Sequence, residues 1–267
     1  MNEIAAPATL REVLRPRHTF NDIPDRVERF AAMQQAIDAR MSRLSDPLVW
    51  GEFIQTWARF PHLSPENICL ILDQQPHATW LNTHRSWGAR ERTPIQRGIA
   101  VIFASVRQLP QGVIPRWDGG RPITSEVRHR PGTLFDYTAT AGAPLEPVWT
   151  EAQNEPREGF LDDLRAAAAT IGYAVEARRD EAPEWRRVFA LIHGQTERQK
   201  TVRLAHQLGA AAGGEAGAEL FAYTLMTVNG MTVTAPQVPA DPHAAVASAR
   251  AGLRRILQRT TFRNYRG

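Results

Sequence analysis

Tryptophan, tyrosine and arginine alternate through the first half of the sequence, a combination that can bind single-stranded nucleic acid. Aromatic rings stack on any base, at about 1 to 3 kcal/mol per base, while guanidinium groups neutralise phosphates. The aromatic residues are Trp57, Trp80, Trp87, Trp117 and Tyr137, and the interleaved arginines are Arg59, Arg85, Arg90, Arg92, Arg97 and Arg116. This set predicts sequence-independent binding of single-stranded DNA.

The strongest candidates for contact lie in segments of different character. Trp87, Arg90 and Arg92 belong to a charged stretch that ends at Pro94, which favours exposed positions. Trp57 lies at helical spacing in an apolar segment, which is also typical of a core residue. The predicted DNA-binding residues are Trp57, Asn67, Gln74, Trp87, Arg90, Arg92, Arg97 and Arg116.

Asn67 and Gln74 have two interpretations. They are seven residues apart, so on one helix they share a face and could present their amides to a ligand together. Ser64 followed by Pro65 is a typical helix start, and Asn67 could instead belong to the first turn and assist the cap at Ser64. The sequence leaves both open.

The composition is that of a globular protein with one large or two small domains. The chain has 267 residues, 43% of them hydrophobic and 22% charged. Its single cysteine, Cys69, lies in the apolar run NICLIL, which predicts a core residue and excludes an internal disulfide or a cysteine-rich zinc site. No apolar run reaches membrane-spanning length, and the first residues lack a signal-peptide core, so we expect a cytoplasmic protein.

Arginine carries almost all of the positive charge. The formal net charge is +4, and Lys200 is the only lysine. A GC-rich genome produces this bias, but arginine also suits nucleic acid because its planar fork binds phosphate and stacks on bases. The charge alone does not separate the two explanations.

Hydrophobic periodicity predicts an α+β fold of two small α+β domains. After an arm at residues 1–20, the first domain spans 21–150, with helices starting at an N-cap at Asn21, after Asp46-Pro47 and after Ser64-Pro65. Its strands are expected at 78–81, 99–106 and 134–140, with a long exposed loop at 109–132. The linker EAQNEPRE occupies 151–158. The second domain, 159–267, is expected to contain a helix at 158–171, strands at 173–177 and 187–192, helices at 201–212, 216–228 and 242–258, and a basic tail.

Motifs between Trp57 and Gly142 occur in a specific order. They are Ser64 and Asn67, Leu70-Ile71, Gln74 with Pro76-His77-Ala78-Thr79, Trp87, Arg92, Arg97-Gly98-Ile99, Phe135-Asp136, Thr140, and Gly142-Ala143-Pro144-Leu145. In order and spacing they resemble the N-terminal domain of the ArdC- and LtrC-like antirestriction proteins, and the resemblance implies a domain that binds single-stranded DNA. Glu91 departs from the pattern, because the family has a glycine at that position.

The segments LAHQLGA at 204–210 and EAGAELFAY at 215–223 are similar to that family's metallopeptidase helix and to the helix that supplies its third ligand. Such a site needs two histidines four residues apart and a glutamate as base. His206 keeps the first place, whereas Gln207 replaces the base and Ala210 the second ligand. The resemblance therefore implies a zincin-like domain that has lost its catalytic residues, with no zinc expected. The vestigial positions are His206, Glu215 and Glu219.

Three functions remain open at this stage. The favoured one is sequence-independent single-stranded DNA binding by an antirestriction or DNA-protection protein of a mobile element or phage, with the second domain as a scaffold. The second is a protein–protein interaction module whose basic tail binds an acidic host or phage partner. The third is a metal-dependent peptidase with an altered ligand set, against which Gln207 and Ala210 count. We expect single-stranded DNA as partner, allow for a protein partner, and expect neither a membrane nor a small-molecule cofactor.

Overall fold

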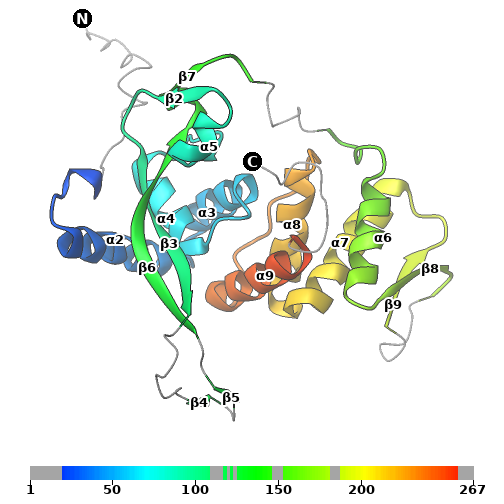
Figure 1. Cartoon of the computed structure of the whole chain (residues 1–267). Helices are drawn as coiled ribbons and strands as arrows, with labels where there is room; N and C mark the ends of the chain where they lie inside the picture. Colours follow the sequence, from blue (N-terminus) through cyan, green and yellow to red (C-terminus); the bar gives the residue numbers. More distant parts are fainter. Residues whose placement is uncertain are drawn as a thin grey trace, which may run out of the picture. The chain divides into compact units, whose positions relative to one another are not determined.

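The computed structural model confirms an α+β fold (Figure 1). It describes residues 20–108, 117–118, 121–122, 125–145, 153–180 and 187–257. The chain forms two compact units, one from Met1–Ile37 with Asp73–Gly142 and the other from Asp38–Leu72 with Ala143–Gly267. This division differs from the predicted domains of 21–150 and 159–267, because residues 38–72 group with the C-terminal half of the chain.

The first unit is built around a long antiparallel strand pair. β3 (Ile99–Gln108) pairs with β6 (Ser125–Asp136), from Ile99 opposite Leu134 to Gln108 opposite Ser125, and β1 (Leu81–Asn82) pairs with the end of β6. Figure 1 shows β3 and β6 as a twisted ribbon. Smaller sheets join β2 (Arg92–Pro94) to β7 (Thr140–Gly142), and β4 (Trp117–Asp118) to β5 (Arg121–Pro122).

Polar side chains fix the backbone at the inner end of this ribbon. The amide of Gln74, at the end of α4 (Pro65–Gln74), donates to the carbonyl oxygen of Ala100 and accepts from its N–H, at 2.9 and 2.8 Å. Asp136 accepts hydrogen bonds from the backbone N–H groups of Thr79, Trp80 and Thr138. Both side chains are buried, so they satisfy backbone groups that water cannot reach.

Further helices and 3-10 turns complete the first unit, whose N-terminal segment ends at Ile37, within the first of these helices. α2 (Arg26–Met41) begins at Asp25, whose carboxylate accepts the N–H of Glu28 at 2.7 Å. η1 (Phe20–Asp22) precedes it, α5 (His84–Gly88) is capped by Thr83, and η2 (Tyr137–Ala139) follows Asp136. The predicted N-cap at Asn21 was wrong because Asp25 takes that role, while Asn21 donates to the carbonyl oxygen of Gly98.

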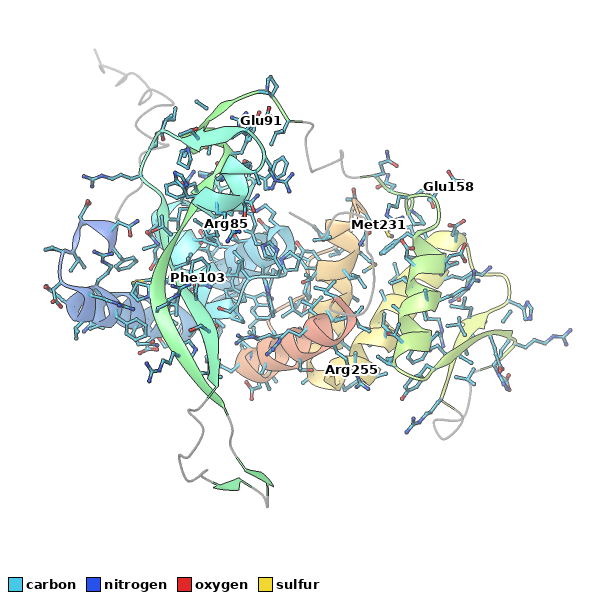
Figure 2. The ribbon with its side chains drawn as sticks, in the orientation of Figure 1. Arg85, Glu91, Phe103, Glu158, Met231 and Arg255 are labelled. Atoms are coloured by element: carbon cyan, nitrogen blue, oxygen red, sulfur yellow. The ribbon has the colours of Figure 1, made fainter. Side chains whose placement is uncertain are left out.

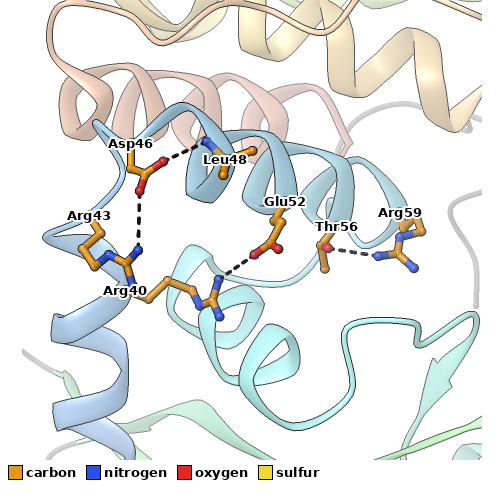
Figure 3. Close-up of polar contacts among 7 residues, drawn as sticks. All are labelled: Arg40, Arg43, Asp46, Leu48, Glu52, Thr56 and Arg59. Atoms are coloured by element: carbon orange, nitrogen blue, oxygen red, sulfur yellow. Dashed lines mark hydrogen bonds and ion pairs between the residues drawn. The ribbon is translucent and has the colours of Figure 1, made fainter. Parts of the chain in front are cut away.

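The second unit is mainly helical. Its elements are α3 (Pro47–Arg59), α4 as far as Leu72, α6 (Phe160–Thr170), β8 (Ala174–Arg178), β9 (Val188–Ile192), α7 (Glu197–Gly213), η4 (Glu215–Gly217), α8 (Ala218–Val228) and α9 (Pro242–Leu257). β8 and β9 pair in parallel. α3 begins as predicted, with Asp46 capping the N–H of Leu48 and Pro47 in the first turn. Glu52 of this helix forms an ion pair with Arg40 at 3.2 Å (Figure 3).

Glycines allow α7, α8 and α9 to pack closely. A Cβ at Gly209 would lie 2.8 Å from the ring of Phe221, and one at Gly213 would lie 2.2 Å from the carbonyl oxygen of Ser248. At Gly217 the nearest atom would be the backbone nitrogen of Ala249, at 2.3 Å. None of the three positions has room for a side chain. The backbones of the helices therefore pack directly against one another at these glycines.

Most predicted elements are confirmed, with differences in the first unit. The helices of the second unit and the strands near 173–177 and 187–192 form as expected. The predicted loop at 109–132 was partly wrong, since residues 125–132 belong to β6 and pair with β3. The strand predicted at 134–140 ends at Asp136, because that side chain caps the following 3-10 turn. No helix in the described part of the chain is long and apolar enough to cross a membrane.

Candidate nucleic-acid interface

Trp80, Trp87 and Tyr137 form what we term the aromatic cluster of the first unit. The ring centroids of Trp80 and Trp87 are 5.4 Å apart in an edge-on arrangement, and those of Trp80 and Tyr137 are 6.1 Å apart and nearly parallel. The N–H of Tyr137 also donates to the carbonyl oxygen of Trp80. The cluster therefore joins residues that lie far apart in the sequence through both ring and backbone contacts.

Two arginines lie over rings of this cluster. The guanidinium carbon of Arg90 is 5.2 Å from the ring centroid of Trp80, and that of Arg92 is 4.2 Å from that of Tyr137. Arg92 is buried, and it donates to the hydroxyl and carbonyl oxygens of Thr140 and to the carbonyl oxygen of Gly142. Arg92 thus holds β7 against β2. Arg90 differs from it in being half-buried.

Exposure divides the cluster into a core member and a surface pair. Trp87 is fully buried, and its indole N–H donates to the carbonyl oxygen of Phe135 at 2.8 Å. Trp80 and Tyr137 are half-buried. The indole nitrogen of Trp80 is buried and has no hydrogen-bond partner among the described residues. Trp80 therefore presents a partly exposed ring with the half-buried Arg90 over it.

Further cationic and polar side chains come from α5. His84 and Arg85 are exposed, and the ring of His84 packs edge-on against Phe135, with centroids 6.2 Å apart. Figure 2 shows Arg85 on this helix and Glu91 in the turn that leads to β2. Arg97 is also exposed, and it forms a surface ion pair with Asp22.

The remaining predicted contacts are elsewhere. Trp57 is fully buried, packs edge-on against Phe53 and belongs to the second unit, so it is a core residue. The expectation that Trp87 and Arg92 are exposed was likewise wrong, because both complete backbone hydrogen bonds in the interior.

The two amides do not form a shared surface. Gln74 is buried on Ala100, and Asn67 is buried with its N–H directed to the hydroxyl of Ser64. The capping role of Ser64 is therefore present. Arg116 lies outside the described residues, and for Trp117 only the backbone is described.

The structure also shows where the vestigial metal positions lie. His206, Glu215 and Glu219 are all exposed. The oxygen of the Gln207 amide is buried with no partner among the described residues. No group of three or more histidine, cysteine, aspartate or glutamate side chains in the described ranges is placed to hold a metal ion. The donor set on α7, with Ala210 in the second place, does not fit a three-ligand zinc site.

Comparison with known proteins finds structural neighbours only. No family model and no curated protein matches the sequence. The chain is similar to the metal-free crystal structure of the antirestriction protein ArdC from the R388 plasmid, at 14% identity and a TM-score of 0.43, over 86% of this chain and 92% of that one. It is also similar to the Mn(II)-bound structure of that protein, at 13% identity and a TM-score of 0.40, over 72% and 86% of the two chains.

Trp80 and Tyr137 belong to the interleaved aromatic set but are not among the residues predicted from the sequence to contact DNA. Trp80 directly precedes the two-residue strand β1, and Tyr137 directly follows β6. Aromatic residues at strand ends lie where the regular core stops, which is the signal that could have selected them.

Proposed function

We propose that the chain binds single-stranded DNA without sequence preference, and that the surface formed by Trp80, Tyr137 and Arg90 is the primary contact. The observation that carries the proposal is the half-buried Trp80 ring with the Arg90 guanidinium over it. The motif order that resembles the ArdC- and LtrC-like antirestriction proteins supports the same function. Coating of entering single strands by a mobile-element or phage protein is the role that we propose for this binding.

Binding at this surface requires an exchange of partners. Arg90 over Trp80 is a cation–π contact, worth about 0.5 to 1 kcal/mol at an exposed site. A base stacked on the same ring contributes about 1 to 3 kcal/mol. The exchange is favourable if Arg90 moves from the ring to a phosphate, because the guanidinium then gains a charged partner. His84 and Arg85 on the neighbouring α5 add side chains that can contact the same strand.

The buried residues keep this surface in place. Trp87 supports Trp80 from the interior, and Arg92 supports Tyr137. Neither needs to touch DNA for its replacement to weaken binding. Substitutions at these two positions would therefore reduce the stability of the first unit together with affinity, whereas a substitution at Arg90 would reduce affinity with little change in stability. Trp80 packs on both neighbouring rings, so its replacement should lower stability to a small extent as well as affinity.

Fluorescence anisotropy with a labelled single-stranded oligonucleotide tests the proposal. Trp80→Leu should weaken binding by about 5- to 150-fold, the equivalent of one stacked base. Arg90→Ala should lower the slope of log affinity against log salt by about 0.7, as expected for one phosphate contact on a single strand. Thermal unfolding should confirm that both variants remain folded.

Tyr173→Leu is the matched control. Tyr173 is a half-buried aromatic residue of the second unit, stacked on Phe189 with centroids 4.4 Å apart. Its replacement should leave oligonucleotide affinity unchanged. An absence of single-strand binding by the wild-type chain at low salt would refute the proposal, and equal losses in the Trp80 and Tyr173 variants would refute the assignment of the surface.

A further inference from the structure

The outer half of the β3–β6 ribbon is a separate feature of the first unit. We term it the ribbon arm, and define it as Phe103–Gln108 paired with Ser125–Arg130. At the inner end of the ribbon Ile99, Val101 and Leu134 are buried. In the arm, Ala104 and Ser105 on one strand and residues 127–130 on the other are exposed. Side chains alternate between faces along a strand, so both faces of the arm reach solvent.

An exposed ribbon of this kind has little reason to persist for stability alone. Two strands without a covering layer are marginal in water, and their free edges invite pairing with other chains. Within the described residues, β1 is the only further strand in this sheet, and it pairs with β6 only at Phe135 and Asp136. The arm is therefore a two-stranded element that projects beyond the packed part of its sheet, as Figure 1 also shows.

The pairing register of the arm is nevertheless well defined. The ring of Phe103 lies across Gly132, where a Cβ would be 2.2 Å from the ring carbons. This arrangement, an aromatic residue covering a glycine on the neighbouring strand, fixes which residues face each other. Figure 2 shows the position of Phe103 on the ribbon. A fixed register gives the arm a constant pattern of side chains on each face.

One face of the arm is cationic. Arg128 and Arg130 are two residues apart on β6, so they share a face, and they lie opposite Ser105 and Phe103 of β3. His129 occupies the other face and is also exposed. In the pairing register Glu126 of the arm lies opposite Arg107, so the two strands of the arm carry more arginines than carboxylates. A surface of this charge is complementary to a phosphate backbone.

From this geometry we propose that the ribbon arm binds duplex DNA by entering the major groove, with Arg128 and Arg130 on its phosphates. The major groove of B-DNA is about 12 Å wide and admits a two-stranded β-ribbon, whereas a helix-covered sheet cannot enter it. The aromatic cluster and the arm are separate surfaces of one unit. The chain therefore binds a junction between single-stranded and duplex DNA more tightly than either alone.

The double variant Arg128→Thr/Arg130→Thr tests the arm, since threonine retains strand propensity. Anisotropy titrations would use the full chain with a labelled single strand, a blunt duplex, and a duplex with a single-stranded overhang. For the duplex, affinity should fall tenfold or more and the salt slope should decrease by about 2, one for each phosphate contact. Affinity for the single strand should change by less than about twofold, because no contact there is removed.

Arg26→Ala/Arg165→Ala is the charge-matched control, because both arginines are exposed on helices outside the arm. This variant should keep duplex affinity close to that of the wild type. The inference is overturned if the wild-type chain does not bind duplex at low salt, if the two double variants behave alike, or if the arm variant loses single-strand binding equally. Duplex binding without single-strand binding would refute the proposed function but would still support duplex binding by the ribbon arm.

Discussion

The aromatic cluster of the first unit and the three-helix packing of the second are stabilised in opposite ways. Around the cluster, buried polar side chains hold backbone groups: Asp136 binds three N–H groups and Arg92 binds the carbonyl oxygens of β7. In the second unit, the close packing of the helices depends on glycine at positions 209, 213 and 217, where a side chain would not fit. The first arrangement positions half-exposed rings, whereas the second only brings helices together.

This difference predicts which variants affect binding. A defect in the polar network of the first unit should move Trp80 and Tyr137, and so reduce DNA affinity as well as stability. A defect in the helix packing should reduce stability and leave affinity unchanged at temperatures where the chain is folded. Because the chain has two compact units, separate unfolding transitions are the appropriate measurement.

Asp136→Ala should have the largest effect. It leaves the N–H groups of Thr79, Trp80 and Thr138 without an acceptor in a site where Asp136 is 1% exposed. We expect a loss of about 3 to 5 kcal/mol in the free energy of unfolding of the first unit, measured in urea. Asp136→Asn keeps one oxygen acceptor and should lose less, and Glu155→Ala, at an exposed acid, should change stability little. Equal stability of wild type and Asp136→Ala would contradict this account.

Gly213→Ala should destabilise the second unit by about 2 to 3 kcal/mol, because overpacking against backbone cannot be relieved by a rotamer change. The clash is with the carbonyl oxygen of Ser248. Gly51→Ala in α3 is the matched control: nothing lies within 4 Å of its Cβ position, so the same change should stabilise by about 0.5 to 1 kcal/mol. Calorimetry should show a lower stability for Gly213→Ala and a higher stability for Gly51→Ala. Reduced DNA affinity of folded Gly213→Ala would contradict the proposed difference between the two units.

Local sequence signals were sufficient for most elements. Asp46-Pro47 and Ser64-Pro65 mark helix starts through their own side chains and ring, so no distant partner is needed. β6 differs, because residues 125–132 contain arginines, a proline and a glycine that resemble a loop. Their strand conformation depends on pairing with β3 and on Phe103 covering Gly132, which are long-range contacts.

The candidate site was only partly predictable for the same reason. Interleaved aromatics and arginines indicated the right part of the chain, but the choice among them depends on burial. Trp87 and Trp80 lie seven residues apart, yet Trp87 is buried with its indole N–H bonded to Phe135, whereas Trp80 is half-buried. The residue pattern predicted a helix at 201–212, where α7 lies, whereas the exposure of His206 depends on which face of α7 packs against α8 and α9.

Glu66 provides a smaller, pH-dependent test in the second unit. Burial raises the pKa of this carboxyl, but hydrogen bonds from Ser64 and Arg250 outweigh burial and place its pKa below the ordinary 4.5. A carboxyl whose pKa is lowered in the folded state contributes stability that is fully present above the unfolded pKa. This stability is lost as the pH falls through the folded pKa. Because both partners are partly exposed, Glu66→Gln should cost less than about 1 kcal/mol near pH 7. The difference from wild type should vanish in acid, and its persistence there would exclude the ionised pair as its cause.

Glu91 gives the smallest expected effect. Its φ is +57°, in the left-handed region that favours glycine. A non-glycine residue there costs about 1 to 2 kcal/mol, and glycine costs about 0.5 to 1 kcal/mol of chain entropy, so Glu91→Gly should stabilise the first unit by roughly 0.5 kcal/mol. Glu91→Ala retains the strain and should give no gain. If Glu91→Gly is instead less stable than Glu91→Ala, the left-handed backbone at this position is not a source of strain.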